Sequence, residues 1–237
     1  MAEAGALSYD DLLALTKQAL GGRSTGLMTD TWYQGRINAG YSRLCTFQGP
    51  VLAPGASESQ RRVVRFNELY ETDTHTIAPG LSSNFITPVH SAHTVFYVDN
   101  VYDITYDRRM RRKAIRYMKS RPRTTTGAPR MWAPAGNAGV VGYYVWPLPS
   151  AAAHDVEETV YVFPEALATG GANDPIIPAS WHDAIWMAAA QKAASIIDWP
   201  EKAQEMEQMF MSFIATNRSP VEEAGGAGGR RWIGIGG

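Results

Sequence analysis

The first 50 residues contain two stretches in which apolar side chains recur every three or four positions, the spacing of one helical face. In the first stretch the apolar face is Tyr9, Leu12, Leu13, Thr16 and Leu20. In the second stretch it is Tyr33, Ile37, Tyr41 and Leu44. The pattern therefore predicts two helices, and the second begins near Thr29 or Asp30 and stops before Gln48.

Polar residues and glycines mark where the first helix begins and ends. Ser8 can cap the helix, and Asp11 stands where the reciprocal acid of a capping box belongs. Gly21 and Gly22 follow the last apolar residue, and glycine tolerates the left-handed turn that ends many helices. We expect the helix between these two signals.

From about Val51 the pattern changes to short runs of β-branched and aromatic residues separated by Pro, Gly and Ser. The predicted strands are Val63–Tyr70, Thr94–Tyr102, Val140–Trp146 and Thr159–Phe163. We expect them to form an antiparallel unit. One helix interrupts it, from Asp107 to about Lys119, because Pro122 ends helical structure.

Helical spacing returns after Pro178 and predicts two further helices. Ser180 with Asp183, and Asp198 with Glu201, match the capping-box pattern at their starts. The apolar faces are Ile185, Ala189, Ala193, Ile196 and Ile197 in the first, and Ala203, Met206, Phe210, Phe213 and Ile214 in the second. Six alanines between residues 184 and 194 would let a neighbouring helix approach closely.

These elements together predict an α+β fold. Residues 1–49 and 176–220 are expected to form one discontinuous helical bundle. Residues 50–175 are expected to form an inserted antiparallel β domain that carries the basic helix 107–119. Residues 221–237 are a Gly-rich C-terminal extension, too rich in glycine to hold a regular element alone. Side chains that anchor interfaces end this extension, at Arg230, Arg231, Trp232, Ile233 and Ile235.

Composition narrows the class of protein. Hydrophobic residues make up 45% of the 237 residues, which is typical of a globular chain. No apolar run approaches the roughly 20 residues of a membrane helix, so no membrane partner is expected. Cys45 is the only cysteine, which excludes an intrachain disulfide and fits synthesis in the cytoplasm.

Charge is distributed unevenly although the net charge is only −1. Residues 108–154 hold ten Lys and Arg and no acid, so the rest of the chain holds twelve basic and 23 acidic residues, a net charge of −11. The basic positions of the predicted helix are Arg108, Arg109, Arg111, Arg112, Lys113, Arg116 and Lys119, and Arg121, Arg123 and Arg130 extend the patch. A solvated helix face, a phosphate-binding surface and a surface for an acidic protein neighbour are all compatible with this pattern, and we favour the protein neighbour.

No catalytic, cofactor-binding or metal-binding site is predicted. His90 and His93 are three apart in an extended segment, which places them on opposite faces. Cys45 lies on an apolar face, where a small buried side chain is the usual role. The serines lack a nucleophile elbow, no phosphate-binding glycine loop is present, and the acids form no evident pair. The sequence therefore argues against an enzyme.

The order of three motifs carries a resemblance to a known family. An early helix contains Ile37, Asn38, Gly40 and Tyr41, a turn with Gly127 and Pro129 precedes an aromatic strand, and a helix starts at Pro178, Trp181, His182, Asp183 and Ala184. In this order, over roughly residues 8–213, the chain resembles bacteriophage head-to-tail adaptor proteins of the tail-tubular and connector type. The arginine density of residues 108–130 departs from that pattern.

The resemblance implies a structural virion protein in the neck. It implies a ring, commonly dodecameric, that lies beneath the portal protein, contacts a downstream tail or stopper protein and forms part of the channel for DNA. It also implies a C-terminal extension that reaches the portal. A tail-completion or stopper protein of the same virion, and a nucleic-acid-binding module with strongly salt-dependent affinity, remain alternatives.

Overall fold

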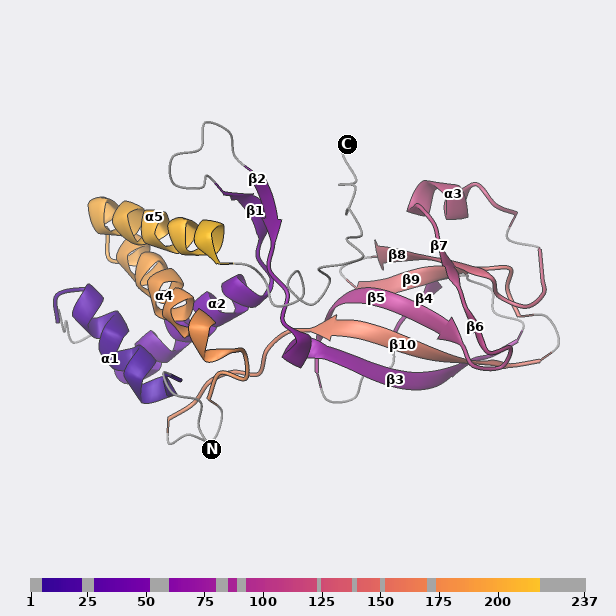
Figure 1. Ribbon diagram of the computed structural model, residues 1–237, viewed down its shortest axis with the longest axis horizontal. Coiled ribbons are helices and arrows are strands. Elements are labelled where there is room, and N and C mark those ends of the chain that lie inside the picture. The colour runs from indigo at the N-terminus through magenta and orange to yellow at the C-terminus, as the bar shows by residue number, and fades with distance from the viewer. Residues whose placement is uncertain are drawn as a thin grey trace. The chain divides into compact units, whose positions relative to one another are not determined.

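The computed structural model describes residues 6–22, 28–51, 60–79, 85–88, 93–122, 125–137, 140–149, 152–169 and 174–217. The chain forms two compact units, Met1–Glu68 with Pro164–Gly237, and Leu69–Phe163. We name them the helical unit and the β unit. Their borders lie at residues 68/69 and 163/164, whereas the sequence pattern placed them near residues 50 and 175. The fold is α+β, as predicted (Figure 1).

The helical unit contains four main helices and one hairpin. The elements are α1 (Tyr9–Ala19), α2 (Asp30–Cys45), β1 (Gln48–Val51), β2 (Gln60–Val63), α4 (His182–Ile196) and α5 (Pro200–Thr216). Helix α4 packs against α1, α2 and α5, and α5 also contacts β1. Helices from the two ends of the chain therefore share one apolar core.

The predicted starts of α1 and α2 are confirmed. Ser8 and Asp11 form the full capping box, in which the Asp11 amide donates to Ser8 Oγ at 3.2 Å and the Ser8 amide donates to Asp11 Oδ2 at 2.9 Å. Thr29 caps α2 with its hydroxyl alone, which accepts the Trp32 amide at 3.2 Å. Beyond α1, Gly21 and Gly22 both adopt positive φ, as a glycine stop requires.

Helices α2 and α4 meet at a glycine. A Cβ on Gly40 would lie 2.7 Å from the Ile185 carbonyl oxygen and 2.8 Å from the Ala189 nitrogen, so the two backbones are nearly in contact there. The predicted alanines of α4 are all buried, at positions 184, 188, 189, 190, 193 and 194. Small side chains on both helices permit this approach.

The starts of α4 and α5 lie within one residue of the prediction, but both predicted capping boxes are wrong. Ser180 lies in a 3₁₀ turn, Ala179–Trp181, and α4 begins at His182, where Nδ1 accepts from the Leu7 amide and Nε2 donates to the Ile177 carbonyl. Asp198 adopts φ +56° and ends α4 instead of capping α5. Ile196, predicted to be inward, is 48% exposed. At α4, hydrogen bonds of His182 to distant backbone groups replace the expected cap. Before α5, the left-handed turn at Asp198 replaces it.

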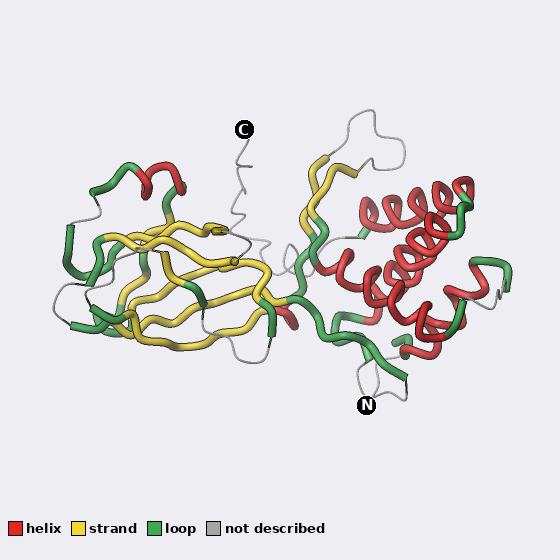
Figure 2. Tube along the Cα trace, turned by 180° about the vertical axis from the view of Figure 1, so that it is seen from behind, coloured by secondary structure: helices red, strands yellow, loops and turns green. Residues whose placement is uncertain are grey.

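The β unit consists of two four-stranded sheets that lie face to face (Figure 2). One has the order β3 (Tyr70–Ile77), β10 (His154–Val162), β5 (Val95–Asp103) and β6 (Arg108–Arg109). The other has the order β4 (Phe85–Ile86), β9 (Val140–Trp146), β8 (Met131–Asn137) and β7 (Arg111–Arg112). All pairs within these sheets are antiparallel except β7 with β8.

The strand predictions succeeded where the apolar pattern was longest. Val140–Trp146 is β9 as predicted, and β5 differs from its prediction by one residue at each end. The predicted strand Val63–Tyr70 is wrong, because the chain forms a 3₁₀ turn at Asn67–Leu69 and β3 begins only at Tyr70. Strand β10 begins five residues before Thr159, since His154 and Glu158 alternate inward with the valines.

The predicted basic helix 107–119 is also wrong. Only α3 (Ile115–Lys119) is helical. Arg108 and Arg109 pair with β5, and Arg111 and Arg112 pair with β8, so the segment crosses from one sheet to the other. Met110, which is 2% exposed, lies between the sheets at the crossing. Backbone pairing with β5, across the short turn at residues 104–107, and with the more distant β8 thus overrides the helix-forming tendency of Arg, Lys and Met.

Candidate functional site

The basic segment is fixed to the β unit by Arg108. Its guanidinium lies 3.1 Å from Oδ2 of Asp103, a fully buried carboxylate at the end of β5, and also donates to the Pro129 carbonyl at 2.7 Å. The Asp103 carboxylate accepts the Tyr106 amide, and the Tyr106 ring lies 4.8 Å from the Arg108 guanidinium. This arginine is therefore a structural anchor rather than a free cation.

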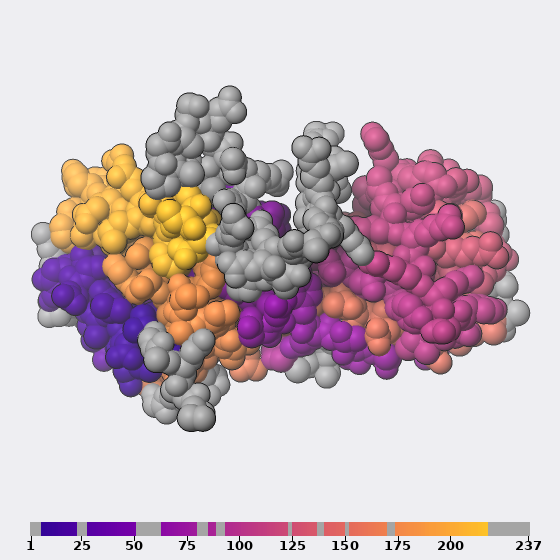
Figure 3. Space-filling model, viewed as in Figure 1, coloured from indigo at the N-terminus to yellow at the C-terminus, as the bar shows by residue number. Residues whose placement is uncertain are grey.

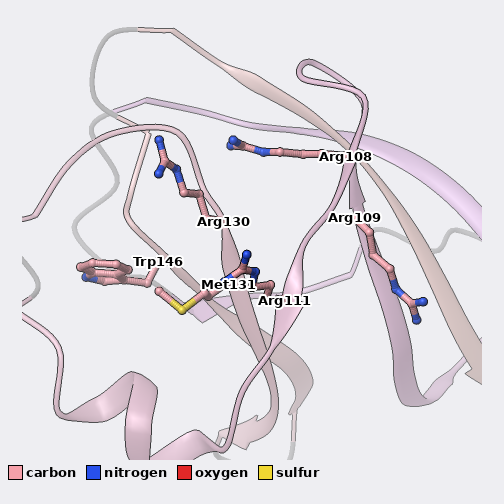
Figure 4. A pocket seen from close by; sticks show the side chains of 6 residues that line it. All are labelled: Arg108, Arg109, Arg111, Arg130, Met131 and Trp146. Atoms are coloured by element: carbon pink, nitrogen blue, oxygen red, sulfur yellow. The ribbon is translucent and has the colours of Figure 1, made fainter. Parts of the chain in front are cut away.

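A concavity opens beside this anchor, between the ends of the two sheets. Its volume is about 510 Å³, and its lining is Arg108, Arg109, Arg111, Arg130, Met131 and Trp146. We name it the arginine concavity. Figure 4 shows Arg108 and Arg130 extending into the same space, with Met131 and Trp146 beside them, while Arg109 projects to the other side of β6.

Three arginines of this group are exposed: Arg109, Arg111 and Arg130. Within the part of the chain that the structure describes, none of them has an acidic partner within 4 Å. The β unit explains this, because all of its ten basic residues fall within residues 108–130 and all eight acidic residues fall outside that segment. Positive potential therefore accumulates at the concavity and favours an anionic partner.

Aromatic rings lie beside several other bases of the segment. Arg112 lies over Tyr97 and Trp132 at 5.5 Å from each ring centroid. Arg121 lies 4.4 Å from the Tyr117 ring centroid and 5.3 Å from that of Trp146. Such cation–π contacts hold the charges at the surface without neutralising them. The segment, in pink, forms much of the visible face of the β unit in Figure 3.

Two buried carboxylates inside the β unit escaped the sequence analysis. Besides Asp103, Glu158 is fully buried, accepts the Tyr143 hydroxyl and lies 3.1 Å from His75 Nδ1. Burial, and then the charge of Glu158, raise the pKa of Tyr143 well above its ordinary value. An alternating pattern with an acid at an inward position was the available signal, at Glu158 in VEETV. Neither carboxylate lines the arginine concavity, although Asp103 binds Arg108, which does.

Chemistry other than recognition has little support among the described residues. They contain no cluster of three or more His, Cys, Asp or Glu that could hold a metal ion. Cys45 is buried, and burial raises its pKa well above the ordinary value, which disfavours the reactive thiolate. His93 pairs with Glu71 at 2.6 Å. None of the described helices is both long and apolar enough to cross a membrane.

The structure brings together only part of the predicted charged interface. Arg108, Arg109 and Arg111 meet at the arginine concavity, whereas Arg112, Lys113, Arg116 and Lys119 lie outside its lining. The lining also includes Arg130, directly before β8, and Trp146, at the end of β9. The predicted docking residues Arg230, Arg231, Trp232, Ile233 and Ile235 lie outside the described residues, as do His90 and Arg123.

Comparison with known proteins identifies the family. Residues 8–231, which include parts of both units, match the family model described as SU10 adaptor protein. A comparison with curated proteins gave no match. The family match confirms the resemblance to bacteriophage head-to-tail adaptors, which are structural virion components. The chain therefore belongs to the SU10 adaptor protein family.

Proposed function

We propose that this protein forms a ring, with twelve copies as the expected number, that joins the phage portal to the tail or a stopper protein. The ring would lie in the neck of the virion and form part of the channel through which DNA leaves the head. The observation that carries this proposal is the adaptor family match over residues 8–231. A mechanical role needs no active site. Assembly into a ring is consistent with the uneven charge, because patches of opposite charge can join neighbouring subunits.

The two units suggest a division of labour within the ring. The helical unit, with helices from both chain ends packed as a bundle, would be the rigid scaffold. The β unit presents exposed, uncompensated arginines, and complementary charge steers and orients protein partners. Substitution of these arginines should therefore affect joining of subunits more than folding of the chain.

The C-terminal extension would attach the ring to the portal. The thirteen residues from Arg218 to Arg230 can span up to roughly 45 Å when extended, and their glycines impose no shape. Burial of Trp232, Ile233 and Ile235 would contribute about 1.5–3 kcal/mol each. Ordering the strand costs about 1–2 kcal/mol per residue, so one extension binds weakly. Many extensions on one ring would bind tightly through avidity.

The test is a truncation after Glu223. We expect the truncated protein to keep its helicity and melting temperature yet to lose binding to DNA-filled heads that carry portal but lack this protein. Circular dichroism and sedimentation with such heads would measure the two properties. Normal attachment of the truncated protein, with infectious particles, would exclude the portal-docking role of the extension.

Full-length variants separate side-chain docking from simple chain length. Replacing Trp232, Ile233 and Ile235 together by alanine should reduce head binding as far as the truncation does. Replacing Gly225 and Gly226 by serine should leave binding nearly intact, because the linker only needs reach. If the wild-type protein bound tails but not portal-bearing heads, the stopper assignment would replace the adaptor one.

A further inference from the structure

The outer strands of the two sheets in the β unit differ sharply in length. Strands β4, β6 and β7 have two residues each, whereas β3 has eight and pairs with β10 without a register shift. Proteins usually protect edge strands by shortness, proline, a bulge or charged side chains. Strand β3, YETDTHTI, is long and has no proline, and its charged side chains are the acids Glu71 and Asp73. Within the described residues, β3 has a strand neighbour on one side only.

The charge of this edge is opposite to that of the other edge of the same sheet. Strand β3 carries Glu71, which pairs with His93, and the exposed Asp73, and it has no Lys or Arg. Strand β6, at the far edge, is Arg108–Arg109 and leads directly to Arg111. The two edges are three strand spacings apart, roughly 14 Å. One unit therefore has an acidic edge, Glu71 with Asp73, at one border of this sheet. The arginine concavity begins at the opposite border, β6, and is completed by Arg111, Met131 and Trp146 of the other sheet.

Two unlike patches on opposite borders suit head-to-tail association of identical copies, the arrangement that closes rings. A symmetric pairing of two β3 strands would instead bring their acids together, which is unfavourable across strands. We propose that the β3 edge of one copy lies against the arginine concavity of the next copy, with Asp73 bound between Arg111 and Arg130. This inference rests on the proposed ring and names the contact that joins its subunits.

The chemistry of both patches favours this protein contact over DNA. Arginine binds carboxylates through paired hydrogen bonds. The Asp73 carboxylate is already oriented, because its Oδ1 accepts the Thr74 amide at 2.7 Å. Met131 and Trp146 add apolar area to the concavity, which a protein surface can cover and a phosphate cannot. Arg108 positions the rim through Asp103 and remains bound to its own unit.

The test reverses the charge of each patch separately. One variant is Asp73→Lys, and the other combines Arg111→Glu with Arg130→Glu. Each is added to DNA-filled heads that carry portal but lack this protein, and ring-bearing heads are counted by electron microscopy. For each variant alone we expect at least about a tenfold drop in the fraction of ring-bearing heads, because every subunit contact becomes repulsive.

Mixing the two variants gives the sharper result. In a ring of alternating variants, Lys at position 73 faces the two glutamates, and the native Asp73 faces the native arginines. An even-numbered ring can close in this way. An equimolar mixture should therefore restore ring-bearing heads to near the wild-type fraction, with the two variants present in equal number by mass spectrometry.

Controls and contrary outcomes are distinct. Glu201→Lys on α5 and Arg116→Glu on α3 change exposed charges outside both patches and should leave rings intact. Unchanged melting temperatures would show that the reversed variants fold.

Normal rings from either reversed variant, or no restoration on mixing, would overturn the contact while leaving the ring intact as a proposal. Full rings that lose DNA retention would assign the concavity to DNA. A wild-type protein that forms no ring on heads would refute both proposals.

Discussion

The helical unit and the β unit bury polar groups in different ways. In the helical unit, the buried Thr16 and His182 bond to backbone groups, at Leu12 for the threonine and at Leu7 and Ile177 for the histidine. In the β unit, the buried polar groups include two carboxylates, each with a histidine nearby and at least one further donor. The helical unit also buries Arg65, which donates to the Val64 carbonyl, but among the described residues the buried carboxylates are in the β unit, where charge pairing adds to apolar packing.

This difference explains how the β unit keeps positive charge at its surface. Asp103 and Glu158 lie inside the unit and bond to its own groups, so they do not neutralise the exposed arginines. Asp103 also fixes Arg108 and thereby the crossing of the basic segment between the two sheets. The buried acids thus maintain a recognition surface, whereas the helical core mainly provides stability.

Asp103→Ala should cause the largest loss of unfolding free energy, and this loss should fall on the β unit. The substitution leaves Arg108 without its carboxylate and the Tyr106 amide without its acceptor, and we expect the β unit to lose about 2–4 kcal/mol. Urea unfolding would measure the loss. The double variant Asp103→Ala with Arg108→Met should lose less unfolding free energy than the two single variants lose in sum, because the two residues act as a pair.

Cys45 can show whether this loss stays in one unit. It is the only cysteine, it is buried in the helical unit, and its raised pKa disfavours the reactive thiolate. We expect thiol labelling in Asp103→Ala to remain as slow as in the wild type under native conditions. Faster labelling of Cys45 in Asp103→Ala would mean that the two units unfold together. It would contradict the claim that the buried carboxylates stabilise the β unit alone.

The next effect is expected in the helical unit from Gly40→Ala. The added methyl group would meet the backbone of α4 at 2.7–2.8 Å, so α2 and α4 must separate, at a cost of about 1–3 kcal/mol. Gly35→Ala is the matched control, because it lies in the same helix with nothing within 4 Å of the new atom. That change should stabilise by about 0.5–1 kcal/mol. Equal denaturation midpoints for the two variants would contradict the close approach of these helices.

Local signals in the sequence were enough for much of the helical unit. The capping box at Ser8, the stop at Gly21 and the apolar faces of α1 and α2 depend on residues within a few positions of one another. The failures in this unit occurred where distant groups decide. His182 fixes the start of α4 through Leu7 and Ile177, and no pattern around Ser180 contains that information.

The candidate site was predictable in composition but not in form. The charge asymmetry singled out the correct segment, because ten bases without an acid are visible in the sequence alone. Its conformation depends on pairing with β5 and β8, which lie before and after it in the chain. Arg130 and Trp146 complete the concavity for the same reason. Nonlocal strand pairing therefore limits what periodicity can reveal.

The smallest effect should follow from an exposed acid of the helical unit, Asp11, which contrasts with the buried acids of the β unit. Hydrogen bonds from the Ser8 hydroxyl and then the Ser8 amide lower the pKa of Asp11 below its ordinary value of 3.8. A carboxyl group with a lowered pKa in the folded state stabilises that state above its unfolded pKa. The stabilisation by Asp11 should therefore be full at neutral pH and should fade as pH drops below about 3.8 through the pKa of the folded state.

The variant Ser8→Ala removes the hydroxyl but keeps the amide, so the pKa of Asp11 should rise only part of the way towards its ordinary value. Loss of the cap should cost about 1 kcal/mol at pH 7. Titration of the Asp11 carboxyl by NMR in both proteins would measure the shift, and an ordinary pKa in the wild type would show that the capping box does not hold in solution.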